Sequence, residues 1–372
     1  MDFQTRDDFN ATVDLLLTRF PDTYSSDRGH QVVSWTQCEE GLPYLKDLIE
    51  KNENHEVSFS NMQSFAELLL RYLYERENYD TAKQYLEASI NTFSDCTSLS
   101  YTSAIDLRGL IELDIGHPHD SLKYFEQAFN LRKAVLPEDD PFLAANFVNY
   151  GLAFTDIGDL NRARDYLQKS IDIRLKAKSD RIGNSYSNMA SLLLRMDKPD
   201  EAEDMLKGCP SLANFTGETF LKTGNPRFSG DMVLLSRIRL KQGLYDDALR
   251  LASKALTFRR ECLPQRLKVC DSLYQVADLL QQGDNYEMVS QLLSECVRIS
   301  EGLPKSEGQR HMARALFKLS KISERRGSLK ESAEFLNRAN SVKADIANRE
   351  KSVLDSGNMD ADFEHLVPWM LW

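Results

Sequence analysis

No stretch of this 372-residue chain has the character of a membrane span or of a targeting signal. Its apolar runs fall short of the ~18–20 residues that a transmembrane helix needs. The first residues, Met1–Asp8, are polar and acidic and lack the apolar core of a secretory signal peptide. The sequence therefore favours a soluble protein, and we expect it in the cytoplasm, with the nucleus left open.

Signatures of common cofactor and catalytic sites are also missing. There is no GxxxxGK[ST] phosphate-binding loop, no glycine fingerprint for dinucleotides, and no GxSxG or HExxH motif. We therefore expect no cofactor and predict no catalytic residue. Some helical folds catalyse with residues that no motif marks, so an enzyme or enzyme subunit stays as the alternative.

Candidate metal ligands are few and scattered. His117 and His119 share one predicted turn, but no third ligand follows in the sequence, so we predict no metal there. Cys209 and Cys296 fall where packed helices need a small residue, which favours buried free thiols over a zinc or redox site. The six cysteines contain no CxxC pair: Cys38, Cys96, Cys209, Cys262, Cys270 and Cys296.

Negative charge predominates, with 46 Lys and Arg residues against 57 Asp and Glu residues and a net charge of −11. This balance disfavours a general role in binding nucleic acid or an anionic membrane. The repeat architecture described next, rather than the composition, leads us to expect a protein or peptide partner. The oligomeric state is open.

What the sequence does contain is a repeat between Tyr101 and Arg174. Gly109 and Gly116 in the first copy return as Gly151 and Gly158, 42 residues later. A period in this range, without strand-like alternation, is typical of stacked helix pairs. Gly158 ends one apolar helix and an amphipathic helix follows it, so each copy is predicted to be a helix–turn–helix unit.

Seven such units can be aligned on one small residue early in the second helix, where two helices approach closely. The predicted fold class is all-α, a right-handed superhelical solenoid of about seven antiparallel helix pairs. The aligned positions are Ala82, Ser121, Ala163, Ala202, Ala248, Val289 and Ser332.

We divide the chain into three parts. Residues 1–60 are expected to form a helical cap, residues 61–345 the repeat solenoid, and residues 346–372 a polar linker with an aromatic tail. Residues 208–230 are predicted to be an ordered insertion that packs on the solenoid, because turn formers alternate there with phenylalanines. Two interpretations of the tail stay open. It folds back over the last helix pair, or it is a linear motif that docks on a partner or in the groove of another copy.

The repeated residues resemble the tetratricopeptide repeat, and most closely the long repeat of kinesin light chains. Ala128–Pro141 is similar to that family's second helix and acidic loop, and Asn149–Gly151 and Asn188–Ala190 are similar to its asparagine-containing element. Phe9–Pro21 and Trp35–Pro43 resemble the segment that opens the repeat tail of fungal STAND-type NTPases. No counterpart of their nucleotide-binding motif occurs in this sequence.

The resemblance implies a non-catalytic interaction module: a scaffold, an adaptor or the sensor part of a split STAND-like system. In this family the first helices line a concave groove that contacts an extended peptide. The alternative is an enzyme whose site lies in the groove or in residues 208–230. We take the residues at equivalent positions of the aligned repeats as groove residues. They are Arg71, Asn149, Asn188, Arg195, Arg237, Lys241, Arg314, Lys318, Lys321 and Arg325, with Asp156, Gln275 and Asp278 at further groove positions.

The last of these residues suggest a charge preference. Arg314, Lys318, Lys321 and Arg325 are spaced by about one helical turn and are expected to form one basic stripe, which Arg237 and Lys241 would extend. An acidic segment would neutralise this stripe. The occupant could be an acidic partner or the chain's own Asp360–Glu364.

Overall fold

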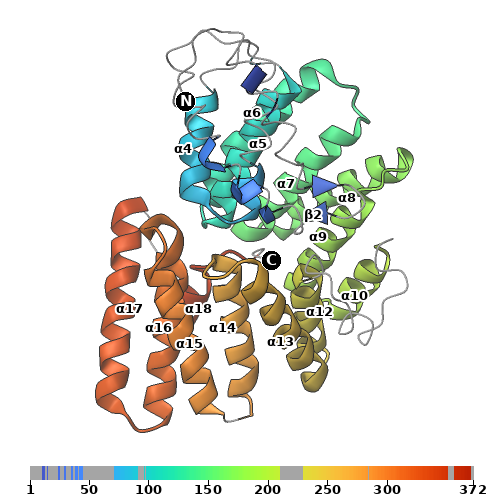
Figure 1. Ribbon diagram of the computed structural model, residues 1–372. Helices are drawn as coiled ribbons and strands as arrows, with labels where there is room; N and C mark the ends of the chain where they lie inside the picture. The colour runs from blue at the N-terminus through green and yellow to red at the C-terminus, as the bar shows by residue number, and fades with distance from the viewer. Residues whose placement is uncertain are drawn as a thin grey trace.

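The computed structural model describes residues 71–90, 96, 98–209, 229–283, 285–350 and 356–369, and single residues between 11 and 44. Within them the protein is a stack of antiparallel helix pairs (Figure 1), which confirms the predicted all-α solenoid. Strands β1 (Tyr24–Ser25) and β2 (Gly29–His30) pair as a short antiparallel hairpin within the part of the chain predicted to be a helical cap. Most of the predicted N-terminal cap, and residues 210–228 of the predicted insertion, lie outside the described residues.

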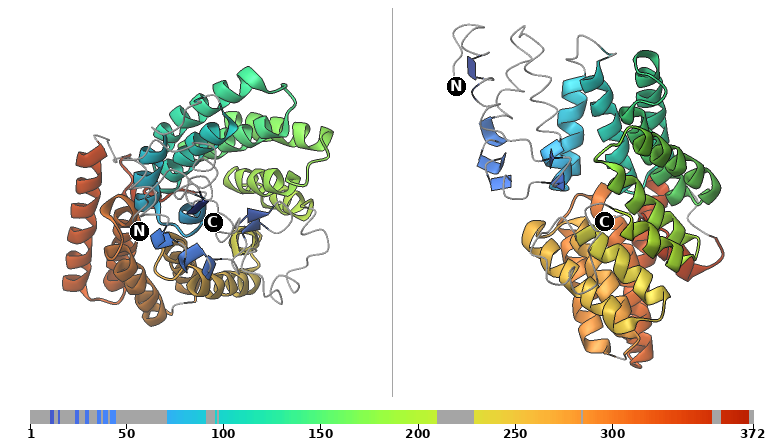
Figure 2. Two further views of the ribbon diagram at one scale, coloured as in Figure 1. Left: turned by 45° about the horizontal axis from the view of Figure 1, so that its top comes forward. Right: turned by 90° about the vertical axis from the view of Figure 1, so that its right-hand side faces the viewer.

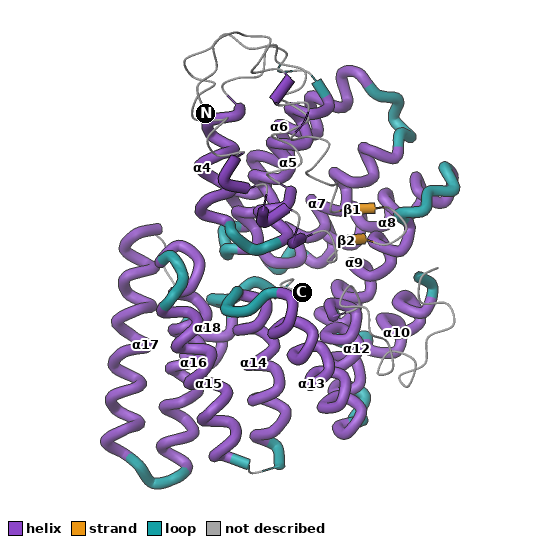
Figure 3. The backbone as a smooth tube through the Cα atoms, in the orientation of Figure 1, coloured by secondary structure: helices purple, strands orange, loops and turns teal. Residues whose placement is uncertain are grey.

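Two helices make each repeat, and short turns join them (Figure 3). The first repeat ends with α4 (Tyr79–Ile90), which follows a helical turn at residues 71–75. A short helix, α18 (Met359–Glu364), follows the last repeat. The pairs between them are α5 (Leu99–Asp114) with α6 (Pro118–Val135), α7 (Pro141–Ile157) with α8 (Leu160–Lys176), α9 (Ile182–Arg195) with α10 (Pro199–Lys207), α12 (Ser229–Lys241) with α13 (Tyr245–Cys262), α14 (Leu267–Gln281) with α15 (Tyr286–Glu301), and α16 (Lys305–Arg325) with α17 (Leu329–Glu350).

Small residues let the helices approach closely, as predicted. A Cβ atom on Gly151 of α7 would lie 2.5 Å from Cγ of Leu167 in α8, and one on Gly109 would lie 2.5 Å from Cε1 of Phe125. A larger side chain at either position would push the pair apart. The aligned small residues are fully buried in six repeats: Ala82, Ser121, Ala163, Ala202, Ala248 and Val289.

A buried arginine near the end of the second helix ties consecutive repeats together. It follows the small residue of its own repeat by eleven positions in each case. A buried guanidinium group needs polar partners, and the first helix of the next repeat supplies them. Arg132, Arg174 and Arg259 donate to Asn146, Ser185 and Ser272 at 2.7, 2.8 and 2.9 Å.

The stack curves round until its first repeat meets its later ones (Figure 2, left). The Glu77 carboxylate, in the turn before α4, accepts a hydrogen bond from the backbone N–H of Lys268 in the first turn of α14, at 3.0 Å. Glu307 of α16 accepts one from the backbone N–H of Asp80 in the first turn of α4, at 2.8 Å. The first N–H groups of a helix lack partners within the helix. Here the caps come from distant repeats.

A second contact joins the turn between α5 and α6 to the last repeat. The His117 ring lies 2.8 Å from Glu112 through Nδ1 and 3.2 Å from Glu350 through Nε2. Arg310 also donates to Glu350, at 2.5 Å, and packs against Gly116 so closely that a Cβ there would lie 2.7 Å from its Nε. Burial alone would lower the pKa of His117, but its hydrogen bonds to Glu112 and Glu350 raise it. The protonated ring can donate to both carboxylates at once.

Candidate functional site

The first helices of the repeats form the inner face of the solenoid, and a segment of the same chain lies on it. We call residues 356–369 the tail segment. It lies on the inner face, inside the ring of helices (Figures 1 and 2), where it contacts α14 and α16 through Glu364 and Leu366 and contacts α12, α9 and α7 through Trp369. The tail therefore folds back, as one interpretation expected, but it runs along the groove rather than over the last helix pair alone.

The acidic end of the tail segment packs on the last repeat. The ring of Phe363 stacks on Phe317 of α16, with centroids 4.3 Å apart and planes tilted by 10°. Asp362 accepts a hydrogen bond from Nζ of Lys343 in α17 at 2.7 Å. The same Nζ lies 5.4 Å from the centroid of Phe363. One lysine thus contacts both the carboxylate and the face of the neighbouring ring.

Two further carboxylates extend this contact. Nζ of Lys321 lies 3.5 Å from Asp360. The carboxylate of Glu364 accepts a hydrogen bond from the hydroxyl of Tyr274 in α14. The guanidinium of Arg314 lies 4.0 Å from the centroid of the Tyr274 ring. The acidic end of the tail thus lies against the basic side chains of the last two repeats.

The other end of the tail segment is held through its last described residue, Trp369. Its backbone N–H donates to Asp156 of α7 at 2.7 Å, and its indole N–H donates to Ser191 of α9 at 3.2 Å. The guanidinium groups of Arg195 and Arg237 each lie 5.4 Å from the ring centroid. Tryptophan has the aromatic face that attracts cations most strongly, and here two cations share it.

The tail segment is also held through two of its backbone carbonyl groups. Arg310 donates to the carbonyl oxygen of Leu366 at 3.1 Å, and Arg237 donates to that of Trp369 at 3.2 Å. The side chains of Leu366 and Val367 are buried. Because Arg310 also contacts Glu350, one side chain belongs both to the tail-binding face and to the closure of the ring.

A cluster of buried charge lies beneath the tail segment. Asp271 of α14 lies 3.2 Å from Arg237, 3.3 Å from Arg314 and 3.9 Å from Arg259. Burial alone would raise the pKa of Asp271, but the three guanidinium groups lower it. Burial and the charge of Arg314 lower the pKa of His311 to about 3, so that ring is neutral. Three cations share one carboxylate, which gives this part of the face an excess of positive charge.

Several of the groove residues predicted from the repeat alignment contact the tail segment or lie beneath it. Arg195 and Arg237 contact its tryptophan, Lys321 contacts Asp360, and Arg314 shares Asp271 with Arg237. Asp156, which the same repeat alignment places in the groove, accepts a hydrogen bond from the backbone N–H of Trp369. Burial raises the pKa of Asp156, and the hydrogen bond from Trp369 opposes that rise.

The other basic residues predicted for the groove do not pair with the carboxylates of the tail segment, although Nζ of Lys318 lies 4.9 Å from the ring centroid of Tyr274. Lys318 pairs with Asp278 of α14, and Lys241 lies 2.8 Å from Asp197. Acidic residues of neighbouring repeats therefore interrupt the expected basic stripe. Arg325 is exposed, and Nε of Arg71 lies 3.8 Å from Glu75.

The two predicted asparagines are engaged within the chain. The amide nitrogen of Asn149 donates to Asp106 at 3.3 Å, in a buried network with Arg132 and Asn146. That of Asn188 donates to the backbone carbonyl of Asn184 in its own helix, at 2.8 Å.

Five residues that hold the tail were missed at the sequence level: Ser191, Tyr274, Arg310, Phe317 and Lys343. Helical spacing could have found Ser191 and Arg310. Ser191 lies between Asn188 and Arg195 at intervals of three and four residues, and Arg310 precedes Arg314 by four. Both therefore share a helix face with predicted residues.

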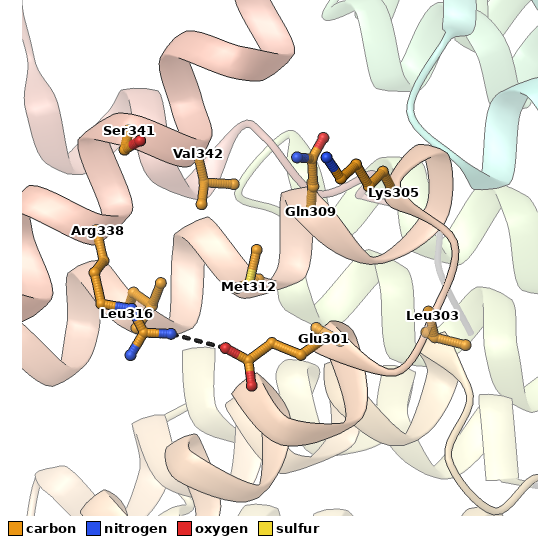
Figure 4. A pocket seen from close by; sticks show the side chains of 10 residues that line it. Glu301, Leu303, Lys305, Gln309, Met312, Leu316, Arg338, Ser341 and Val342 are labelled. Carbon is orange, nitrogen blue, oxygen red and sulfur yellow. Dashed lines mark hydrogen bonds and ion pairs between the residues drawn. The ribbon is translucent and has the colours of Figure 1, made fainter.

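A separate cleft of about 360 Å³ opens between α15, α16 and α17 (Figure 4). Met312, Leu316 and Val342 supply apolar lining, and Arg338 donates to Glu301 across it at 2.8 Å. Glu301 is the one carboxylate among the residues that line this cleft, and it is exposed and paired with Arg338.

The two histidines of the predicted turn have different surroundings. His117 is engaged by two carboxylates, and His119 is exposed. Over the part of the chain that the structure describes, no three His, Cys, Asp or Glu side chains are grouped to hold a metal ion. No described helix combines the length and apolar character that a membrane crossing requires.

Comparison with known proteins agrees with the arrangement of the helices. The family model of the tetratricopeptide repeat matches residues 101–176 and, overlapping them, residues 142–209. Residues 101–209 therefore carry tetratricopeptide repeats, as the sequence predicted. No curated protein matches the sequence.

Solved structures resemble these tetratricopeptide repeats over most of the chain. A Rap protein complexed with Competence and Sporulation Factor has a TM-score of 0.60 at 13% identity, covering 92% of this chain and 99% of that one. NprR in complex with its cognate peptide NprX has a TM-score of 0.55 at 15% identity, covering 95% and 100%. A STAND protein with a tetratricopeptide repeat sensor, from Pyrococcus horikoshii, has a TM-score of 0.52 at 13% identity, covering 98% of this chain and 52% of that one. Identities this low show a common fold alone.

Proposed function

We propose that the protein is a non-catalytic interaction module whose concave face binds an extended segment of a partner protein. One observation carries the proposal: the chain's own tail segment lies along this face and is held at both ends. Two similar structures, the Rap protein and NprR, were solved with Competence and Sporulation Factor and with a cognate peptide. Those complexes support a peptide ligand for this fold as well.

The groove holds backbone groups as well as side chains. Asp156 accepts a backbone N–H, while Arg237 and Arg310 donate to backbone carbonyls. Every peptide offers these groups, so the same contacts are available to a segment of another protein. We place the module in the cytoplasm, as a scaffold, an adaptor or a sensor part of a split STAND-like system, and we expect its partner to be acidic.

The test uses the full-length chain with its own tail weakened by Phe363→Ala and Trp369→Ala. A fluorescent peptide of residues 356–369 is titrated against it, and anisotropy reports binding. We expect saturable binding to this variant and weaker binding to the wild type, because a tethered copy competes at an effective concentration on the order of millimolar.

Circular dichroism and a thermal melt check that the variant is folded. A folded variant that shows no saturable binding up to about 1 mM peptide, the range set by the tethered competitor, would contradict the proposed function.

A further inference from the structure

We infer that the partner segment carries the pattern of the chain's own tail: a phenylalanine flanked by carboxylates and, six residues after it, a tryptophan. In the tail these residues are Asp362, Phe363, Glu364 and Trp369. The inference rests on the proposed function, and it names the chemistry that the groove selects.

The first half of the pattern follows from the surroundings of Phe363. Phe317 offers one flat apolar surface, on which an aromatic ring stacks with its plane nearly parallel. Lys343 lies beside that surface and donates to Asp362. A segment with a polar residue in place of the phenylalanine would leave Phe317 uncovered. A segment with a basic residue before the phenylalanine would oppose Lys343.

The carboxylate after the phenylalanine matches the charge of the groove. Glu364 accepts the hydroxyl hydrogen bond of Tyr274, and the Arg314 guanidinium lies over the same tyrosine ring. Arg314 is one of three arginines that share Asp271, so the face has positive charge that this one carboxylate does not balance. A carboxylate in the ligand supplies part of the balance, whereas a lysine there would add to the excess.

The second half of the pattern follows from the site of Trp369. Arg195 and Arg237 both lie within cation–π range of the indole, and Ser191 accepts its N–H. A phenylalanine would keep the aromatic face but lose the hydrogen bond, leaving the fully buried hydroxyl of Ser191 without this partner. The site therefore selects tryptophan over the smaller aromatic residues.

The spacing between the two halves is fixed by the backbone contacts. Arg310 holds the carbonyl of Leu366, and Asp156 holds the N–H of Trp369. These two side chains lie on different repeats, α16 and α7, so they set the length of chain that reaches from one site to the other. Removing one residue between Glu364 and Leu366 would break one of these contacts. The residue there, His365, is exposed, and its own side chain is expected to matter little.

The experiment compares variants of the 356–369 peptide on the full-length Phe363→Ala/Trp369→Ala chain. The variants are Trp369→Phe, Glu364→Gln and a deletion of His365, with Met359→Ala as the matched control, because that side chain is 48% exposed. We expect each of the three to bind about tenfold more weakly than the wild-type peptide and the control to bind within about twofold. Raised salt should weaken the wild-type peptide more than the Glu364→Gln peptide.

A second receptor tests the indole contact itself. On a chain that also carries Ser191→Ala, the penalty for Trp369→Phe should shrink, since the two changes remove the same hydrogen bond. The unmodified wild-type chain should rank the peptides in the same order at weaker affinity. If the wild-type peptide binds but all variants bind equally well, the pattern is overturned and the proposed function stands. If the wild-type peptide does not bind, the proposed function fails.

Discussion

The carboxylate of Glu77 accepts a hydrogen bond from the backbone N–H of Lys268, which lies 191 residues further along the chain. Glu77 has a left-handed backbone, with φ of 54°, where the corresponding turn of another repeat has Gly158 with φ of 93°. Glycine adopts this conformation without strain and glutamate does not. Asp197 also has a positive φ, of 60°, in the equivalent turn before Ala202. The side chain of Glu77 in addition caps α14 and lies 3.2 Å from Nζ of Lys268. A strained local backbone is thus offset by a long-range contact.

Replacing Glu77 should therefore weaken the protein even though the replacement is far from α14 in sequence. We expect Glu77→Ala to lower the free energy of unfolding by about 1–2 kcal/mol, the usual effect of losing a helix cap. Chemical denaturation would measure this value. Glu87→Ala, at an exposed position of α4, is the control and should change little. A Glu77→Ala chain as stable as the wild type would show that the cap contributes nothing.

Stability should fall as pH rises through neutrality. The pKa of His117 is raised above its ordinary value by Glu112 and Glu350, so its contribution is complete below about pH 6.5 and is lost as pH rises through the folded value. Burial raises the pKa of Glu307 to about 7, so the folded state also loses stability as that carboxyl ionises. Both groups act in the same direction. Melting temperatures measured between about pH 6.5 and pH 8.5 would show the decline, because below this range the buried, neutral His311 acts in the opposite direction.

The control for this pH dependence is the neighbouring histidine. His117→Gln should flatten part of the decline, whereas His119→Gln, at an exposed position, should leave it unchanged. The groups that face His117 are Glu112, Glu350 and Arg310, and none of them is altered in these variants. A wild-type melting temperature that rises over the same pH range would contradict the prediction.

The buried small residues that align in each repeat should not tolerate replacement by a larger side chain. Ala163 is fully buried between α7 and α8, so Ala163→Phe should overpack the pair and cost about 1–3 kcal/mol. The adjacent Arg164 is exposed, and Arg164→Phe introduces the same ring without entering the core. Thermal melts of the two variants provide the comparison. Equal melting temperatures would mean that this helix contact is wrongly placed.

Thiol reactivity should follow burial. Cys96 is exposed and should react with a thiol reagent in the native state. Cys209, Cys270 and Cys296 are buried free thiols, and burial raises the pKa of Cys209 to about 12, which keeps thiolate scarce. They should react only as the chain unfolds in denaturant. Rapid native labelling of Cys270 or Cys296, read by mass spectrometry, would contradict the packing of the last repeats.

The helix pairs could be predicted because their determinants are local. Gly151 and the small residue Ala163 are twelve positions apart and report on one helix–helix contact. The pairing of the residues in the predicted basic stripe depends on contacts that are distant in sequence. Whether Lys318 is free to meet a ligand depends on Asp278, 40 residues earlier on a neighbouring helix, and periodicity does not reveal that pairing.

The position of the tail segment on the solenoid could not be predicted from the sequence either. Packing over the last repeat and running along the groove both bury Phe363 and Trp369, so hydrophobicity alone does not separate the two. The deciding features are Asp156 and Arg195, which lie on first helices more than 170 positions before Trp369. The repeat alignment placed both residues in the groove, but it did not reveal that they contact the tail segment.

Closure of the ring also bears on how such a chain could evolve. Solenoids commonly gain or lose whole repeats, because each repeat contacts only its neighbours. In this protein an extra helix pair inserted between α10 and α12 would carry Lys268 and Glu307 away from Glu77 and Asp80, and both long-range caps would be lost together. Duplication or deletion of a single repeat is therefore penalised at the opposite end of the chain. The number of repeats is therefore constrained by the contacts that close the ring, and not only by the contacts between neighbouring repeats.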